Sequence, residues 1–320
     1  MKCLKIISIS VSIIIIGFVG FTLASRAVKP VESSAFVNNN IDELDENQIT
    51  EIPKITSDLP IAKFDEVIAE LTKLQQVNQD FLSRPGWYHY EKETWNISLV
   101  TQQESEDALF STAGMFPPTQ ILEEWFQVLD NDATLGLGHF SVTSDENGNS
   151  VQVVVSDSQG NGGNLTLLER GLTDVFTNNV TEENEDVFIN PVKLSSSIQT
   201  IINGFERVKD FSPVIKAGLI IKDGIEEYQI LIQTNVIDEP YEFEWSLEPV
   251  NGFITFYRID LQTGIILETT DYDVGLSGMV YESFSEITLI AEIVDIMPMD
   301  VQQRYETALN QYMNLLEQGE

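Results

Sequence analysis

Three stretches of the chain repeat apolar residues at helical spacing. Residues 58–81 place an apolar side chain at every third or fourth position, and Pro60 suits the first turn of such a helix. The Arg-Pro-Gly sequence at residues 84–86 marks its end. The same period returns over residues 194–209 and 300–316. We therefore expect one helix before the main body of the chain, one in its middle and one at its end.

Between these helices, apolar and polar residues alternate, which is typical of strands buried on one face. Residues 120–129 fit either a strand or a short helix. Asn147-Gly148 favours a tight hairpin turn, and Gly264 suits the positive φ that closes another. Strands are expected over residues 87–100, 136–143, 150–156, 164–169, 218–221, 227–236, 241–247, 252–259, 265–272 and 279–288.

The order of the elements is helix, meander, helical insertion, meander, helix. A meander of this length curls to bury its apolar face, and helices are the natural partners of that face. The pattern predicts an α+β fold with a strongly curved antiparallel sheet, formed by residues 58–320 as one domain. Residues 27–57 are polar, acidic and aperiodic, so we expect them to form a flexible linker.

The N-terminus has the pattern of a membrane-inserting segment. Lys2 and Lys5 precede the uncharged apolar run of residues 6–24. The run is close to the length of a spanning helix, which favours an uncleaved anchor within residues 1–26. Residues 22–24 also resemble a signal-peptide cleavage site. Both interpretations place the following chain on the extracytoplasmic side of a bacterial cytoplasmic membrane, either anchored or secreted.

The charge balance narrows the range of partners. The chain has 51 Asp and Glu against 17 Lys and Arg, a formal net charge of −34. Such a surface repels nucleic acid and anionic lipid headgroups, so nucleic acid is not an expected partner. Cys3 is the only cysteine, which leaves the exported part without a disulfide. A domain of this size is able to rely on its own core.

One segment resembles a known family. Residues 256–287 combine an Asp260-x-x-Thr-Gly turn, a strand ending in Tyr272-Asp273, a turn at Gly275 and a final aromatic-Ser-x-Ile pattern. This resembles the periplasmic lipoprotein-carrier fold shared by LolA-like and LolB-like carriers and by the sensor domain of RseB-like regulators. The opening of the domain, an amphipathic helix leading into an aromatic strand, is similar in outline.

The resemblance implies an unclosed half-barrel whose concave face binds acyl chains beneath mid-chain lid helices. In this sequence the lid would be residues 171–209. The carriers hold a buried arginine that helps to control the lid. Arg207 and Arg258 are the arginines that the lid and mid-sheet offer here, and neither lies in a motif that matches the family's.

The residues give little support to catalysis. The two histidines, His89 and His139, are too few for a zinc site in a chain without an available cysteine. No Gly-x-Ser-x-Gly nucleophile motif occurs. A hydrolase using two carboxylates is the enzymatic alternative. The acidic pairs that suggest it are Glu123 with Glu124 and Glu242 with Glu244. We assign no catalytic residue, metal ligand or cofactor.

Acidic turns support a second alternative. Residues 130–132, 145–149 and 157–161 are rich in Asp and Asn, the oxygen ligands that Ca²⁺ prefers. None of them completes an EF-hand. A structural or adhesive cell-surface module with such loops is therefore a hypothesis of a different class.

Our leading hypothesis is a non-enzymatic extracytoplasmic binding protein. Aromatic residues crowd the first strand and a later one, and such side chains line apolar pockets. We expect a lipid, an acyl chain or a lipidated protein to lie in the concave face of the sheet. The predicted ligand-binding residues are Trp87, Trp95, Phe205, Phe243 and Trp245.

Overall fold

The structure is a computed structural model, and the residues that it describes all lie within one compact unit, Thr50–Glu320. None of the helices among these residues is both long enough and apolar enough to span a bilayer. The membrane-inserting segment of residues 1–26 and the linker of residues 27–57 lie outside this part. The described residues are 59–97, 117–129, 135–169, 175–176, 197–222, 224–235, 240–241, 246 and 248–319.

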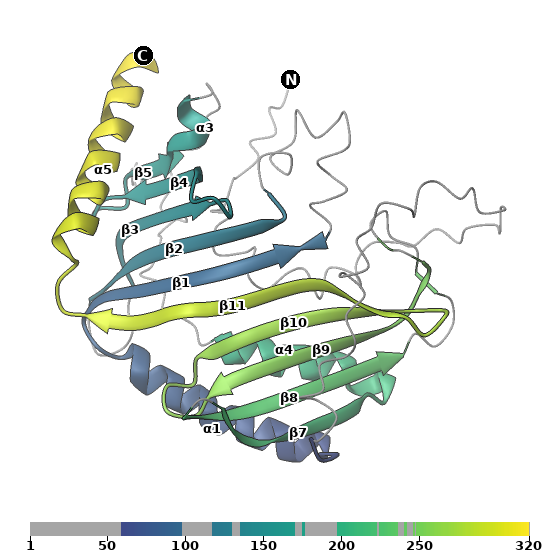
Figure 1. Cartoon of the computed structure of the whole chain (residues 1–320). Coiled ribbons are helices and arrows are strands. Elements are labelled where there is room, and N and C mark those ends of the chain that lie inside the picture. Colours follow the sequence, from purple (N-terminus) through teal and green to yellow (C-terminus); the bar gives the residue numbers. More distant parts are fainter. Residues whose placement is uncertain are drawn as a thin grey trace, which may run out of the picture. The chain divides into compact units, whose positions relative to one another are not determined.

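The described part is an open antiparallel sheet with a few helices (Figure 1). Its eleven strands follow the order β6-β5-β4-β3-β2-β1-β11-β10-β9-β8-β7, and β6 and β7 at the two ends are not paired with each other. The predicted α+β class and the unclosed antiparallel sheet are confirmed. The strands are β1 (Gly86–Asn96), β2 (Thr119–Val128), β3 (Leu135–Ser144), β4 (Ser150–Ser156), β5 (Gly162–Asn164), β6 (Val175–Phe176), β7 (Val214–Lys222), β8 (Ile225–Asn235), β9 (Val250–Asp260), β10 (Ile266–Gly275) and β11 (Val280–Val294). The helices are α1 (Phe64–Leu82), α3 (Leu165–Glu169), α4 (Ser197–Val208), the 3₁₀ turn η9 (Lys209–Phe211) and α5 (Met299–Gly319).

The first and last strands meet in the middle of the sheet. Strand β1 pairs along its length with β11, from Trp87 opposite Val294 to Asn96 opposite Phe284. Every other pair of neighbouring strands in this sheet is consecutive in sequence. The β1–β11 pairing therefore joins two meanders into one sheet, and it connects the two paired strands of this sheet that are farthest apart in sequence.

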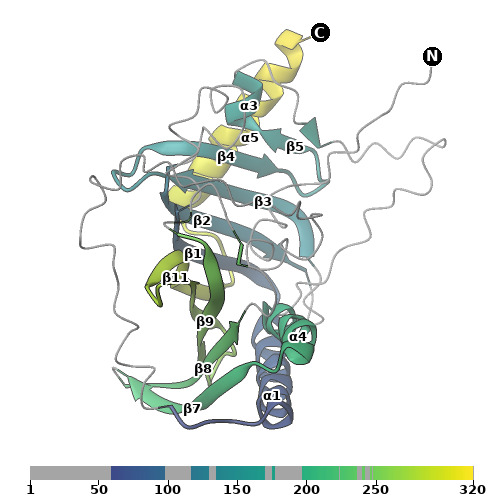
Figure 2. The ribbon, with the colours of Figure 1, turned by 90° about the vertical axis from the view of Figure 1, so that its right-hand side faces the viewer.

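The helices cover opposite faces of the two halves of the sheet. Successive side chains of a strand point to opposite faces. Helices α1 and α4 lie side by side against β7–β9 (Figure 2). Phe205 and Ile230 are in the buried core that they form with these strands. Helix α5 packs against the other half, over Trp125 and Phe140 of β2 and β3. The register of the β1, β2 and β8–β11 pairs puts these two cores on different faces.

Strand β1 shows this arrangement within a few residues. Tyr88 packs with Leu82, at the end of α1. Trp87, the preceding residue, packs with the core under α5. The start of β1 is thus covered on both faces.

Two local predictions were wrong. Pro60 does not begin the first helix: its carbonyl accepts a hydrogen bond from the Ala217 amide of β7 at 3.0 Å, so this segment runs extended along the sheet edge. Helix α1 begins after Lys63, whose backbone amide donates to the Glu66 carboxylate at 3.5 Å and whose ammonium group lies 3.2 Å from the same carboxylate. The predicted strand at residues 164–169 is largely helix α3. The Asn164 side chain caps this helix, because its oxygen accepts a hydrogen bond from the Leu167 backbone amide at 3.3 Å.

Two predicted hairpin turns are confirmed. Gly148 has φ +79° and closes the β3–β4 turn, while Gly264 has φ +64° between β9 and β10. A Cβ atom at Gly264 would lie 2.5 Å from the Leu74 carbonyl oxygen of α1. This turn therefore needs glycine both for its backbone angle and because it packs closely on α1. The predicted strand at 241–247 lies mostly outside the described residues, as do residues 177–196 of the expected lid.

Candidate functional site

A pocket lies where β11 ends and α5 begins. It has a volume of about 340 Å³. Because Trp87 of β1 is opposite Val294 of β11, the chain leaves the sheet beside Trp87 before it enters α5. Helix α5 then carries its first turns back over the same face. The lining residues are Trp87, Asp295, Ile296, Met297, Gln302, Tyr305 and Glu306.

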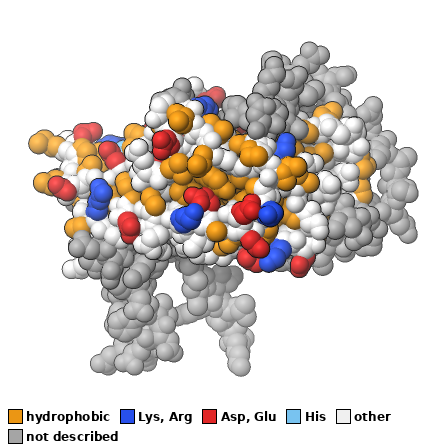
Figure 3. All heavy atoms as spheres, turned by 90° about the horizontal axis from the view of Figure 1, so that it is seen from below, with side chains coloured by type: hydrophobic (Ala, Val, Ile, Leu, Met, Phe, Trp, Pro, Cys, Tyr) orange, Lys and Arg blue, Asp and Glu red, His pale blue; other side chains and the backbone are white. Residues whose placement is uncertain are grey.

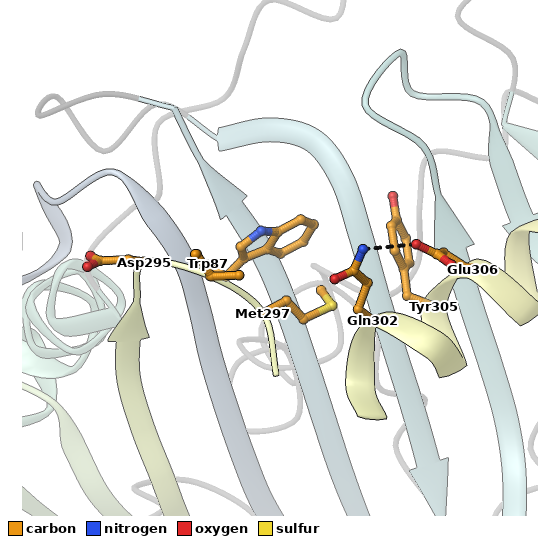
Figure 4. A pocket seen from close by; sticks show the side chains of 7 residues that line it. Trp87, Asp295, Met297, Gln302, Tyr305 and Glu306 are labelled. Carbon is orange, nitrogen blue, oxygen red and sulfur yellow. Dashed lines mark hydrogen bonds between the residues drawn. The ribbon is translucent and has the colours of Figure 1, made fainter. Parts of the chain in front are cut away.

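Aromatic and sulfur-containing side chains form the apolar part of the pocket. Figure 4 shows Trp87, Met297 and Tyr305 around the same space, with the Asp295 carboxylate turned away from it. The Trp87 and Tyr305 rings meet edge to face, with centroids 5.9 Å apart and an interplanar angle of 66°. Such an arrangement is favoured between aromatic rings.

Hydrogen bonds hold the α5 side of the pocket in place. The Tyr305 hydroxyl donates to the Ser156 carbonyl of β4 at 2.7 Å, which fixes the ring over the sheet. Burial raises the pKa of Tyr305 to about 12, and the charge of Asp157 adds to the effect. The Gln302 side-chain amide donates to Glu306 at 2.9 Å. The polar side of the pocket is therefore an amide and a carboxylate, both exposed.

Gly138 of β3 leaves space behind the rings. A Cβ atom at this position would lie 3.3 Å from the Trp87 Cη2 atom, 3.2 Å from the Gln127 side-chain oxygen and 3.6 Å from the Tyr305 hydroxyl. Sequence reasoning missed this residue because a glycine inside a strand has no pattern that names its neighbours.

Charged and aromatic side chains continue the same face beyond the pocket. His89, two positions after Trp87, stacks on Trp125 at 4.0 Å with rings 7° from parallel. Its Nδ1 atom lies 3.1 Å from Glu292, and its buried Nε2 atom has no hydrogen-bond partner among the described residues.

Glu123 is the best-satisfied carboxylate near this site. Arg304 of α5 donates two hydrogen bonds to it, at 2.6 and 2.8 Å, and the Trp125 indole donates a third at 2.9 Å. Burial alone would raise the pKa of Glu123, but these hydrogen bonds and the Arg304 charge lower it. Glu123 thus fastens α5 to the sheet.

The opposite face of the sheet carries buried ionisable side chains. Lys92 of β1 donates to Glu286 of β11 and lies 4.5 Å above the Tyr90 ring. Burial lowers the pKa of Lys92, against the opposing effect of Glu286. On the same face, His139 Nε2 is 3.4 Å from the Glu124 carboxylate. These are paired groups within the sheet.

The predicted ligand-binding residues do not form one site. Trp87 lines the pocket. Trp95 lies on the same face of β1 but eight positions later, about 26 Å away at the usual rise of a strand. Phe205 is only 1% exposed in the core between α1, α4 and the sheet. Phe243 and Trp245 lie outside the described residues.

The acidic pairs that suggested a hydrolase are only partly described by the structure. Glu123 and Glu124 are neighbours on β2 and so face opposite sides of the sheet, which separates them for paired-carboxylate chemistry. Glu242 and Glu244 are outside the described part, as are residues 130–132.

Two of the three turns that suggest calcium binding, residues 145–149 and 157–161, are described by the structure. The Asp145 carboxylate accepts hydrogen bonds from the backbone amides of Asn147 and Asn149, at 2.9 and 2.7 Å. Asp157 makes the equivalent bonds to Gln159 and Asn161. These carboxylates therefore stabilise hairpin turns. Over the ranges that the structure describes, no group of three or more His, Cys, Asp or Glu is placed to hold a metal ion.

Comparison with known proteins adds no family to this description. No family model matches the chain, and no curated protein matches it.

Proposed function

We propose that the chain is a non-enzymatic extracytoplasmic binding protein, and that the Trp87 pocket holds an apolar group of its ligand. The observation that carries this proposal is the pocket itself, in which Trp87, Met297 and Tyr305 present apolar surface around about 340 Å³ of space. Ligand sites are typically concave, mainly apolar and provided with a few polar groups, as this one is.

The size of the pocket limits what it accepts. Pockets for small molecules span roughly 300–1,000 Å³, and this one lies near the lower limit. It suits a small molecule, a lipid headgroup or the end of a chain better than a whole acyl chain. The core around Phe205, one of the residues predicted to bind such a chain, is filled by side chains of α1, α4 and the sheet.

The open antiparallel sheet supports a binding role by analogy. It is the architecture that the resemblance to lipoprotein carriers implies. Export beyond the cytoplasmic membrane rests on the apolar run of residues 6–24.

The test compares two aromatic residues with different surroundings. The full chain is titrated with an uncharged naphthylamine dye whose fluorescence rises in an apolar environment. Trp87→Leu is expected to lose most of the saturable signal, because it removes a wall of the pocket. Phe205→Leu is expected to keep it, because Phe205 lies in the core. Saturable binding that Trp87→Leu leaves unchanged, in a variant that melts cooperatively, would refute the proposed site.

A further inference from the structure

The polar lining of the Trp87 pocket has one sign of charge. Of the seven described residues that line it, none is basic and two are acidic: Glu306, and Asp295, whose carboxylate is turned away from the pocket (Figure 4). Gln302 supplies an amide that donates to Glu306 at 2.9 Å (Figure 4). The side chains that would attract an anionic ligand are thus missing from the lining.

Two basic side chains close in sequence to the lining residues are already paired. Each terminal nitrogen of Arg304 donates a hydrogen bond to the Glu123 carboxylate, at 2.6 and 2.8 Å, and the guanidinium lies 5.6 Å from the Phe140 ring centroid. The Nδ1 atom of His89, two residues after Trp87 on β1, is 3.1 Å from the Glu292 carboxylate. Neither leaves an uncompensated positive charge facing the pocket.

The aromatic lining favours the same kind of ligand. The face of a tryptophan or tyrosine ring attracts a cation through its quadrupole. Here the Tyr305 ring is held by its hydrogen bond to Ser156 and packs edge to face against Trp87. The rings are therefore ordered before a ligand arrives, which reduces the entropy lost on binding.

We infer that the ligand of the Trp87 pocket is a cation carried on a small apolar group, such as a trimethylammonium or an alkylamine. This inference rests on the proposed function, since it names the ligand class of the same pocket. Trp87 and Tyr305 would contact the charged group, Met297 would contact its apolar substituents, and Glu306 would contribute a carboxylate at the rim.

The effect of the charge is expected to be modest. Glu306 is exposed, so solvent and salt screen its field. A cation–aromatic contact at an exposed site corresponds to about a two- to fivefold gain in affinity over an uncharged isostere.

The experiment uses ligands of the same shape and different charge. The full chain is titrated with choline, with its uncharged carbon isostere 3,3-dimethylbutan-1-ol and with the anion 3,3-dimethylbutanoate, and the Trp87 indole NMR signal is followed. We expect choline to bind at least twofold more tightly than the alcohol, and the anion most weakly. Equal or tighter binding of the alcohol or the anion would overturn the inference.

The two proposals fail in distinguishable ways. If the uncharged dye and the alcohol bind at Trp87 but choline has no advantage, the pocket is real and the cation inference is wrong. If neither they nor choline perturbs Trp87, the proposed function itself is wrong.

A charge-removing variant tests the role of the rim. Glu306→Gln keeps the size of the side chain, so it is expected to reduce choline affinity about twofold and to leave the alcohol unchanged. Glu317→Gln, on an exposed position further along α5, is the matched control and should change neither. Equal effects of the two variants would contradict a direct role for Glu306.

A vesicle-binding experiment distinguishes a lipid headgroup from a free cation as the ligand. Flotation with phosphatidylcholine vesicles, compared with phosphatidylglycerol vesicles and with Trp87→Leu, shows whether the pocket takes a lipid headgroup. Flotation that depends on both choline lipid and Trp87 would identify a headgroup. Choline binding without such flotation would identify a free cation. Either outcome supports the inference.

Discussion

Gly138 shows how one residue without a side chain shapes the candidate site. Its position in β3 leaves the Trp87 ring edge and the Tyr305 hydroxyl within 3.3 and 3.6 Å of where a Cβ atom would be. Larger side chains at this point would displace the rings that line the pocket. The pocket therefore depends on a residue that does not itself line it.

The first prediction concerns this position. Gly138→Val is expected to lower the free energy of unfolding by about 1–3 kcal/mol, because it overpacks the space behind Trp87. It should also weaken binding of the uncharged dye. Urea unfolding and dye titration measure the two effects. Ser150→Val, at an exposed position in β4, is the control and should change stability by less than about 0.5 kcal/mol. A stable variant with unchanged binding would contradict the role assigned to Gly138.

Arg258 is the buried charge on which the β8–β10 region depends. It donates two hydrogen bonds to Glu227, at 2.8 and 2.6 Å, and one to Glu268 at 2.7 Å. Glu227 is fully buried and also accepts from Gln229 at 3.0 Å. The sequence singled out Arg258 through a family resemblance, whereas the structure shows it binding two carboxylates across three strands.

The second prediction follows from that pairing. Arg258→Met leaves Glu227 buried without its cation, so it is expected to lower the free energy of unfolding by about 3–5 kcal/mol. Lys73→Met is the control, because Lys73 and Glu70 form an exposed pair on α1 that should contribute less than about 1 kcal/mol. Urea unfolding at pH 7 compares the two. Similar small losses would show that the Arg258 cluster is not a stabilising group.

At the scale of elements, strand β10 places two carboxyl groups on one face. Asp271 and Asp273 accept hydrogen bonds from Thr255 at 2.7 Å and Ser283 at 3.2 Å. Burial raises the pKa of each to about 6, and for Asp273 the charge of Asp271 adds to the effect. Both groups are therefore more easily protonated in the folded chain than in the unfolded one.

The third prediction works out the sign of this effect. A carboxyl whose folded pKa lies above its unfolded value takes up protons on folding, so stability falls as pH rises from about 4 to about 6. Asp271→Asn removes the carboxyl group that causes this fall in stability. The free energy of unfolding of the variant, relative to the wild type, should therefore increase by about 1–3 kcal/mol between pH 4 and pH 7, as measured by urea unfolding.

A matched carboxylate should behave in the opposite way. Hydrogen bonds from Asn149 and Asn147 lower the pKa of Asp145. The ionised carboxylate therefore stabilises the fold above about pH 4, and this stabilisation is lost as the pH falls below that value. Asp145→Asn should therefore lose stability relative to the wild type at neutral pH, and this deficit should shrink on acidification. Parallel pH curves for the two variants would contradict the assignment.

Helix α4 supplies core contacts. Phe205 meets Phe64 of α1 edge to face at 5.9 Å and is almost fully buried. The fourth prediction is that Phe205→Leu lowers the free energy of unfolding by about 1–3 kcal/mol. Thermal and urea unfolding measure it. Glu206→Gln, the exposed neighbour on α4, is the control and should be near neutral. If Phe205→Leu left stability unchanged, α4 would not be an integral part of the core.

At the scale of the whole molecule, charge is the dominant feature. The formal net charge is −34, and on the face shown in Figure 3 acidic side chains lie among basic and apolar ones. A large net charge destabilises a compact state through self-repulsion, and salt screens that repulsion. The charge is thus a cost to stability that depends on ionic strength.

The fifth prediction is that stability rises with salt. The urea midpoint should increase between 20 and 300 mM NaCl, because the Debye length falls to less than 10 Å over that range. The turns of Asp145 and Asp157 already use their carboxylates for backbone amides. Millimolar Ca²⁺ should therefore stabilise the chain no more than Mg²⁺ at equal ionic strength. A specific gain with Ca²⁺ would favour the cell-surface module instead.

The sequence determined most of the elements and little of the site. The helical and alternating periods located α1, α4, α5 and nearly all described strands, because these periods arise within a few neighbouring residues. Gly148 and Gly264 marked hairpin turns for the same local reason. Even the errors were local: an extended edge at Pro60 and a helix cap at Asn164 outweighed the apolar pattern.

Only the tertiary structure decided which strands and faces meet. The pairing of β1 with β11 and the placing of α5 opposite α1 and α4 depend on contacts between residues far apart in sequence. For that reason Trp87 and Phe205, which look alike as aromatic residues in the sequence, differ in the fold. Trp87 lines a pocket beside the start of α5, and Phe205 fills a core on the other face of the sheet. A periodic pattern predicts that a residue is buried. The residues that it packs against depend on contacts between segments far apart in the sequence.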